Sequence, residues 1–157
     1  VTQLVYAAYG VHEDGKSHTG SVVMIGDGAV VQAKSSKQKI VVKSSTEGEL
    51  VGLSDSANNG IHMMKFIQAQ GYQTGPLVLL QDNLGTIALV KKGRSTSERS
   101  RHIDIRHFWL KDRIDIGDVV VEHLPGEEMG AANMLSKPLQ GAQFQKERED
   151  LTHWGEA

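Results

Sequence analysis

The chain has 157 residues, which suits one compact domain that can bury a core without disulfides or a structural metal. It contains no cysteine, so disulfides, thiolate zinc sites, iron–sulfur ligation and a cysteine nucleophile are excluded. No apolar run approaches the length of a transmembrane helix or secretory signal, and we expect no membrane partner.

The net charge of −2 hides an uneven distribution of charge. Two segments, residues 34–43 and 91–113, hold most of the 17 basic side chains. If these segments meet in space, a nearly neutral protein presents one basic face, as nucleic-acid-binding proteins do. Two ordinary solvated faces would explain the same pattern equally well.

The first part of the chain reads as three short strands. We expect strands over residues 2–8, 21–25 and 29–33, with a hairpin turn at Gly26-Asp27-Gly28 between the second and third. Residues 40–43 either extend the third strand or follow a kink in it.

The apolar spacing then changes to that of a helix. Residues at intervals of three and four mark one helical face: Leu50, Leu53, Ala57, Ile61 and Met64. This helix is predicted to start after residues 44–46, where Thr46 and Glu49 match the capping-box pattern, and to end at Gly71.

Strands and helices alternate in the second half of the chain. The pattern predicts strands over 77–81 and 119–123, a basic loop over 91–97, and helices over 84–90, 98–116, 127–135 and 144–151. Three hairpin strands followed by this alternation predict a mixed sheet with helices on its faces. We expect Phe108 and Trp109 in the core rather than stacked on bases.

Two carboxylates are candidates for chemistry. Glu49 borders the apolar stripe of the first helix, so it is either a capping-box acid or a metal ligand at a strand edge. Asp82 directly follows an apolar strand, where turn aspartates and ligand-binding residues both occur. Spacing alone favours the capping and turn roles. His102 and Arg106 are one helical turn apart, as are Asp104 and His107. The Asp104–His107 pair is a weak metal signal that an ion pair explains as well.

Five segments, in order along the chain, resemble the ribonuclease H domains of copia-type (Ty1-like) retrotransposon polyproteins. Residues 44–54 (SSTEGELVGLS) are similar to the family's SSTEAEYVALS. The other segments are 34–38 (KSSKQ), 81–83 (QDN), 101–106 (RHIDIR) and 132–139 (ANMLSKPL), which resemble SSKKQ, DN, K/R-HIDIR and ADILTKPL. The predicted order of strands and helices is also that of ribonuclease H.

The resemblance implies a ribonuclease H-like α/β fold, with a mixed five-stranded sheet flanked by helices. We assign residues 1–140 to this domain and residues 141–157 to a polar helical tail. The implied activity is endonucleolytic hydrolysis of the RNA strand of RNA–DNA hybrids. In that chemistry four acidic residues hold two Mg²⁺ or Mn²⁺ ions, one for the attacking hydroxide and one for the leaving oxygen.

The resemblance places Glu49 and Asp82 at two of the four metal-ligand positions. Asn133 replaces the aspartate of the ADILTK segment, and Tyr6 stands where the first aspartate belongs. The expected metal ligands are thus Glu49, Asp82 and Asn133, with Tyr6 at the altered fourth catalytic position. Two carboxylates leave about two positive charges of the ion pair uncompensated, so we expect weak metal binding and weak or absent hydrolysis.

The resemblance also implies partners. The substrate would be an RNA–DNA hybrid, the neighbouring domain a reverse transcriptase of the same polyprotein, and the location intracellular, in a cytoplasmic particle or the nucleus. Hybrid phosphates would contact basic side chains, for which the sequence offers Lys37, Lys39, Arg94, Arg101 and Arg106. The alternative is a catalytically dead ribonuclease H-like module that binds nucleic acid or a protein.

Overall fold

The computed structural model describes residues 1–92 and 101–152, and for Arg101 and His102 it describes the backbone alone. The elements, in chain order, are β1 (Thr2–Ala8), β2 (His18–Ile25), β3 (Ala29–Lys37), α1 (Ser45–Ala69), β4 (Leu77–Gln81), α2 (Leu84–Lys92), α3 (Arg101–Asp115), β5 (Val119–His123), the 3₁₀ turn η1 (Gly126–Glu128), α4 (Gly130–Ser136) and α5 (Gly141–Thr152).

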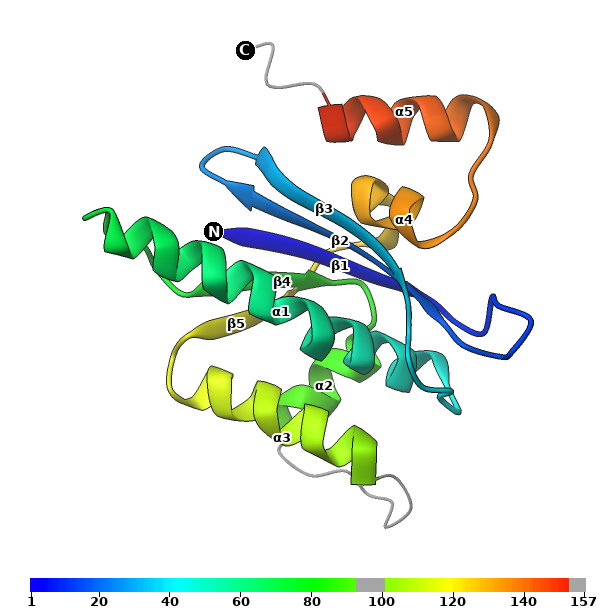
Figure 1. Cartoon of the computed structure of the whole chain (residues 1–157), viewed down its shortest axis with the longest axis horizontal. Helices are drawn as coiled ribbons and strands as arrows, with labels where there is room; N and C mark the ends of the chain where they lie inside the picture. The colour runs from blue at the N-terminus through cyan, green and yellow to red at the C-terminus, as the bar shows by residue number, and fades with distance from the viewer. Residues whose placement is uncertain (93–100, 153–157) are drawn as a thin grey trace.

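The strands form one mixed sheet in the order β3-β2-β1-β4-β5, as the sequence predicts. The first three strands pair antiparallel, whereas β1 with β4 and β4 with β5 pair parallel. Helices α1, α2 and α3 lie on one side of the sheet, and α4 and α5 lie on the other (Figure 1). The prediction of a mixed five-stranded sheet flanked by helices is confirmed.

Each face of the sheet has its own apolar core. The larger core joins α1, α3 and the sheet through buried side chains that include Val5, Leu50, Leu53, Leu79 and Leu110. The smaller core lies under α4 and contains Leu4, Val22, Met129, Ala131 and Ala132. Leu4 and Val5 belong to different cores because successive residues of a strand point to opposite faces.

The start of α1 corrects the predicted capping box. Ser44, not Thr46, caps the helix, and its hydroxyl accepts the backbone N–H of Glu47 at 3.2 Å. Glu47 in turn accepts the backbone N–H of Lys43 at 2.8 Å. Glu49 is therefore not a capping residue. Its carboxyl group is buried and accepts the backbone N–H of Ala7 in β1.

Three other details also differ from the prediction. The hairpin of β2 and β3 extends to His18 and Lys37, and residues 40–43 do not continue the strand. The predicted helix over 127–135 is divided into η1 and α4. Phe108 was expected in the core but is 54% exposed, whereas Trp109 does pack against the larger core.

The predicted polar tail forms α5, which packs against α4 and buries Glu147. No helix within residues 1–92 and 101–152 combines the length and apolarity that crossing a bilayer requires.

At Gly20 the backbone of β2 lies so close to α4 that no side chain fits between them. A Cβ atom at this position would lie 2.1 Å from the backbone oxygen of Ala132, which cannot move without shifting α4. We expect Gly20→Ala to lower the free energy of unfolding by about 3 kcal/mol in urea denaturation, the upper end of typical overpacking effects. Gly75→Ala is the control, since nothing lies within 4 Å of its added Cβ. Equal stability of the two variants would contradict this packing.

Candidate functional site

The site begins where β1 and β4 separate. Their parallel pairing covers only Thr2–Leu4 against Val78–Leu80. Beyond this pairing, side chains bridge the two strands. Both carboxyl oxygens of Glu49, on α1, accept the backbone N–H of Ala7 in β1 at 3.0 Å. Gln81 Nε2, at the end of β4, donates to Glu49 Oε2, also at 3.0 Å. A helix residue and a strand-end residue are thereby fixed together at one edge of the sheet.

Burial dominates the electrostatics of Glu49. The side chain is 4% exposed, and this desolvation raises the pKa of its carboxyl group to about 8. Hydrogen bonds from Ala7 and Gln81 act in the opposite direction, and the charge of Asp82 raises the pKa further. Glu49 without a bound cation is therefore mostly protonated at neutral pH.

Asp82 follows β4 and is part of the same cluster. Its backbone N–H and that of Asn83 donate to Gln81 Oε1 at 2.8 and 3.0 Å, which fixes the turn after the strand. Burial raises the pKa of the Asp82 carboxyl group, while a backbone hydrogen bond and the positive charges of His123 and Lys137 lower it. Asp82 thus lies close enough to Glu49 for its charge to act on that carboxyl group.

Tyr6 lies beside these two carboxyl groups. Burial raises the pKa of its phenol, and the charges of Asp82 and Glu49 raise it further. The Nζ atom of Lys137 lies 5.2 Å from the centroid of the Tyr6 ring, a cation–π contact. The predicted first-acid position therefore does face the site, but a neutral phenol and a nearby ammonium group occupy it.

Asn133 is held by α5. Its Nδ2 atom donates to Glu147 Oε1 at 2.9 Å, and its buried Oδ1 has no hydrogen-bond partner among the described residues. Glu147 also accepts Gln143 Nε2 at 3.0 Å. The role of Asn133 as a metal ligand stays a prediction.

These residues do not make a ready two-ion centre. Within residues 1–92 and 101–152, no group of three or more His, Cys, Asp or Glu side chains is placed to hold a metal ion. The described cluster contains two carboxyl groups, those of Glu49 and Asp82, with the Lys137 ammonium nearby.

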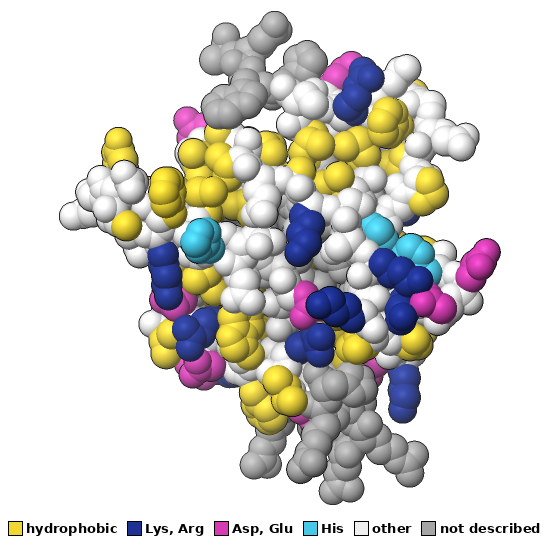
Figure 2. Space-filling view, viewed as in Figure 1, with side chains coloured by type: hydrophobic (Ala, Val, Ile, Leu, Met, Phe, Trp, Pro, Cys, Tyr) yellow, Lys and Arg dark blue, Asp and Glu magenta, His cyan; other side chains and the backbone are white. Residues whose placement is uncertain are grey.

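A basic groove lies on the face of the sheet that α1 and α3 cover (Figure 1). It has a volume of about 640 Å³ and is bordered by the end of β3, α1 and α3. Lys and Arg side chains are scattered over this face of the molecule, several of them next to Asp or Glu (Figure 2). The groove-lining cations are Lys34, Lys37, Lys39 and Arg106, and Trp109 also lines it.

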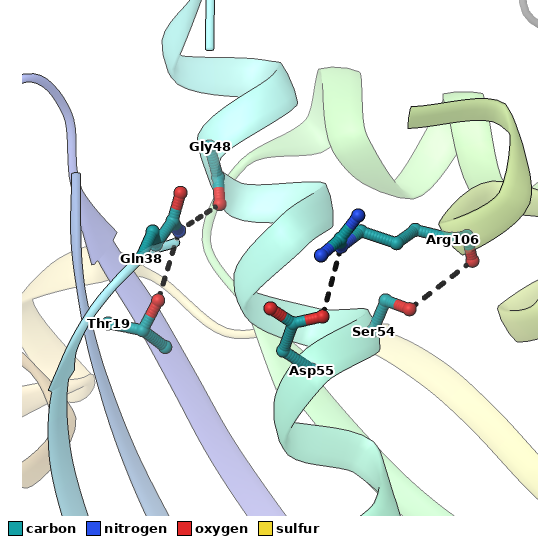
Figure 3. A network of polar contacts seen from close by, with 6 residues as sticks. All are labelled: Thr19, Gln38, Gly48, Ser54, Asp55 and Arg106. Atoms are coloured by element: carbon teal, nitrogen blue, oxygen red, sulfur yellow. Dashed lines mark hydrogen bonds and ion pairs between the residues drawn. The ribbon is translucent and has the colours of Figure 1, made fainter. Parts of the chain in front are cut away.

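Polar contacts fix the walls of this groove (Figure 3). Gln38 Nε2 donates to Thr19 Oγ1 at 3.0 Å and to the backbone oxygen of Gly48 at 2.8 Å, which ties the end of β3 to β2 and α1. Arg106 of α3 pairs with Asp55 of α1, with Nε 3.0 Å from Oδ1. The two basic segments of the sequence thus border one groove, to which the second segment contributes Arg106 among its described basic side chains.

The predicted phosphate-binding residues have different surroundings. Lys37 is paired with Asp14 at 2.8 Å, whereas Lys34 and Lys39 are exposed and have no ion pair within the described part of the chain. Arg94 lies outside the described residues, as does the side chain of Arg101.

Sequence reasoning missed the roles of Gln81 and Lys137. Gln81 is fully buried and joins Glu49, the backbone of Val5 and the turn at Asp82. The available signal was a polar residue ending an otherwise apolar strand. Lys137 gave no such signal, because its approach to Tyr6 depends on the position of α4 against β1.

Comparison with solved structures identifies the fold. The chain superposes on ribonuclease H1 of Halobacterium salinarum with a TM-score of 0.57, 19% identity and coverage of 87% of this chain and 93% of that one. It also matches the LC11 ribonuclease H1 isolated from compost, with a TM-score of 0.65, 12% identity and coverage of 85% and 90%. The protein thus has a ribonuclease H-like fold.

Sequence relatives identify its origin. The chain is 28% identical over 130 residues to the Pol polyprotein of transposon TNT 1-94 from Nicotiana tabacum, covering 83% of this chain and 10% of that protein. It is 26% identical over 136 residues to the Ty1-NL2 Gag-Pol polyprotein of Saccharomyces cerevisiae, covering 85% and 8%. No protein-family model matches. The chain is a homologue of Ty1/copia-type retrotransposon polyproteins, spans about a tenth of their length, and has the ribonuclease H fold.

The pKa of Glu49 predicts a pH-dependent stability. Because folding raises this pKa from 4.5 to about 8, the contribution of Glu49 is fully present below about pH 4.5 and is lost as pH rises through 8. We expect the free energy of unfolding to fall over this range by up to about 1.4 kcal/mol per pH unit. Glu49→Gln should remove this part of the slope in urea titrations without divalent metals. An identical slope in both proteins would show that Glu49 has an ordinary pKa.

Proposed function

We propose that this chain is the ribonuclease H domain of a copia-type polyprotein, that it binds RNA–DNA hybrids, and that its hydrolytic activity is greatly reduced. The observation that carries the proposal is the cluster of Glu49, Asp82 and Tyr6 where β1 and β4 separate. The resemblance assigns these residues to a ribonuclease H centre, and the cluster contains two of the four carboxylates that such a centre is expected to have.

Binding is supported by the basic groove. A solved relative of this fold, LC11 ribonuclease H1, has been crystallised with an RNA/DNA hybrid; it matches this chain with a TM-score of 0.58. In the present chain Lys34 and Lys39 are available to phosphates, and Lys37 and Arg106 are positioned by acidic partners. Contacts of this kind do not depend on base sequence, which suits a protein that must act on any hybrid.

Reduced hydrolysis follows from the charges at the centre. A divalent ion bound by Glu49 must displace the proton that burial favours, and Tyr6 offers only a neutral phenol as a further ligand. Mg²⁺ or Mn²⁺, if bound, would supply charge neutralisation at the scissile phosphate. Among the residues beside the two carboxyl groups, the Lys137 ammonium is the cation that would contact that phosphate.

The second candidate function is a binding module without catalysis. The Lys137 ammonium beside Tyr6 favours it, because a fixed cation there can contact a phosphate without any metal. The reverse transcriptase partner, the intracellular location and the division at residue 140 stay predictions that accompany either function.

Restoring the acids tests the hydrolytic proposal. We expect Tyr6→Asp combined with Asn133→Asp to raise Mg²⁺- or Mn²⁺-dependent cleavage of an end-labelled hybrid by roughly a hundredfold or more, since about 1.4 kcal/mol of transition-state stabilisation gives tenfold. Adding Glu49→Gln to this variant should abolish the gain. If the native chain already cleaves at the rate of the restored variant, our account of charge at this site is wrong.

Salt dependence tests the basic groove. We expect Lys34→Gln with Lys39→Gln to weaken hybrid binding and to reduce the slope of log affinity against log salt by about 2, roughly one unit per lost phosphate contact. Fluorescence anisotropy with a labelled hybrid measures this slope. Lys65→Gln, an exposed lysine of α1 outside the groove, is the matched control. An unchanged slope in the double variant would place the nucleic acid elsewhere.

A further inference from the structure

Two histidines face each other outside the site described above. His12 lies in the connection between β1 and β2, and His18 is the first residue of β2. His12 Nε2 and His18 Nδ1 are 2.9 Å apart, and the ring centroids are 5.1 Å apart with the planes inclined by 44°. The two imidazoles therefore meet through one nitrogen atom each.

The remaining nitrogen of His18 is also engaged. His18 Nε2 lies 2.8 Å from Ser35 Oγ on β3. When His18 donates this N–H to Ser35, the neutral ring directs the lone pair of Nδ1 toward His12. Metal-bound histidines are held in this way, because a hydrogen bond from the second nitrogen fixes both the tautomer and the ring orientation.

We propose that His12 Nε2 and His18 Nδ1 bind one late first-row transition-metal ion of the Ni²⁺ or Zn²⁺ class, with Ser35 orienting His18. Imidazole nitrogens bind such ions at about 2.0–2.1 Å, so two ligands lie about 2.9 Å apart at the right angle of octahedral Ni²⁺ and about 3.4 Å apart at the tetrahedral angle of Zn²⁺. The observed separation of 2.9 Å is that of a hydrogen bond between the rings, and it equals the octahedral spacing. Binding requires the rings to tilt, and the proton on His12 Nε2 must move through solvent to His12 Nδ1 so that both ligand nitrogens present a lone pair.

Water would complete the coordination. In the described ranges 1–92 and 101–152, no third His, Cys, Asp or Glu joins this pair as a ligand group. The histidines border a pocket of about 470 Å³ that also receives Ser35 and the C-terminal end of α4, which leaves room for water ligands. Lys137 lines this pocket as well, but its ammonium group lies against Tyr6.

The chemistry of this pair separates it from the carboxylate site. Imidazole nitrogens favour Zn²⁺, Ni²⁺ and Cu²⁺, whereas the carboxylates of Glu49 and Asp82 suit Mg²⁺ and Mn²⁺. Burial and the neighbouring His12 lower the pKa of His18, which keeps its ring in the neutral form that metals require. A bound ion would fix the β1–β2 connection to the sheet.

Calorimetric titration of the metal-free chain with NiCl₂ tests this site. We expect one Ni²⁺ per chain, binding at least tenfold weaker in His12→Ala and in His18→Ala, and binding about 10–100-fold weaker in Ser35→Ala, as for other second-layer partners. His62→Ala removes an exposed histidine of α1 and should leave affinity unchanged. Asp82→Asn should also retain binding, which separates this ion from one at the carboxylates.

A measurement on the native chain avoids any dependence on variants that fold poorly. Substoichiometric Ni²⁺ should broaden the imidazole NMR signals of His12 and His18 before those of the other histidines. The proposal is overturned if no saturable binding occurs, if affinity survives both histidine substitutions, or if Asp82→Asn abolishes it. If the histidines bind no metal, the proposals of hybrid binding and cleavage are unaffected, because neither His12 nor His18 belongs to the carboxylate cluster or the basic groove.

Discussion

The structure depends on one buried interaction, the contact of the Glu49 carboxyl group with the backbone of Ala7 and the side chain of Gln81. Parallel pairing of β1 and β4 stops at Leu4, and the backbone groups beyond it need other partners. Glu49 and Gln81 supply them from α1 and β4. The same bonds that satisfy the split strands therefore place a carboxyl group at the end of the sheet where β1 and β4 separate.

This arrangement explains how the scaffold can persist when its charges do not suit two metal ions. Protonated Glu49 needs no counter-ion, Asn133 is bound by Glu147, and Tyr6 packs beside Lys137. These contacts satisfy only part of the polar groups, because Asn133 Oδ1 and Glu147 Oε2 are buried without a hydrogen-bond partner among the described residues. Acids at these positions would instead repel one another without bound cations, so metal binding and folding would be more strongly coupled than they are here.

The proposed nucleic-acid surface is a different part of the molecule. The groove between β3, α1 and α3 is held by Gln38 and by the Arg106–Asp55 pair, none of which belongs to the carboxylate cluster. Substitutions in the carboxylate cluster should therefore leave this basic surface intact. The histidine pair on the opposite side of the sheet is a third unit, tied to the strands through Ser35. Binding, hydrolysis and metal capture by imidazole can each be removed separately by substitution.

The sequence by itself determined the order of strands and helices and the mixed sheet, because periodicity and local motifs are properties of neighbouring residues. It proposed Glu49 and Asp82 as site residues only through a family resemblance, since spacing alone favoured capping and turn roles. It misplaced the cap at Thr46 and the side chain of Phe108, where several local patterns compete. Only the tertiary structure decided that Gln81 joins the site, that Lys137 lies over Tyr6, and that His12 meets His18. Those contacts join residues from different elements, so they depend on how the elements pack, which no local pattern encodes.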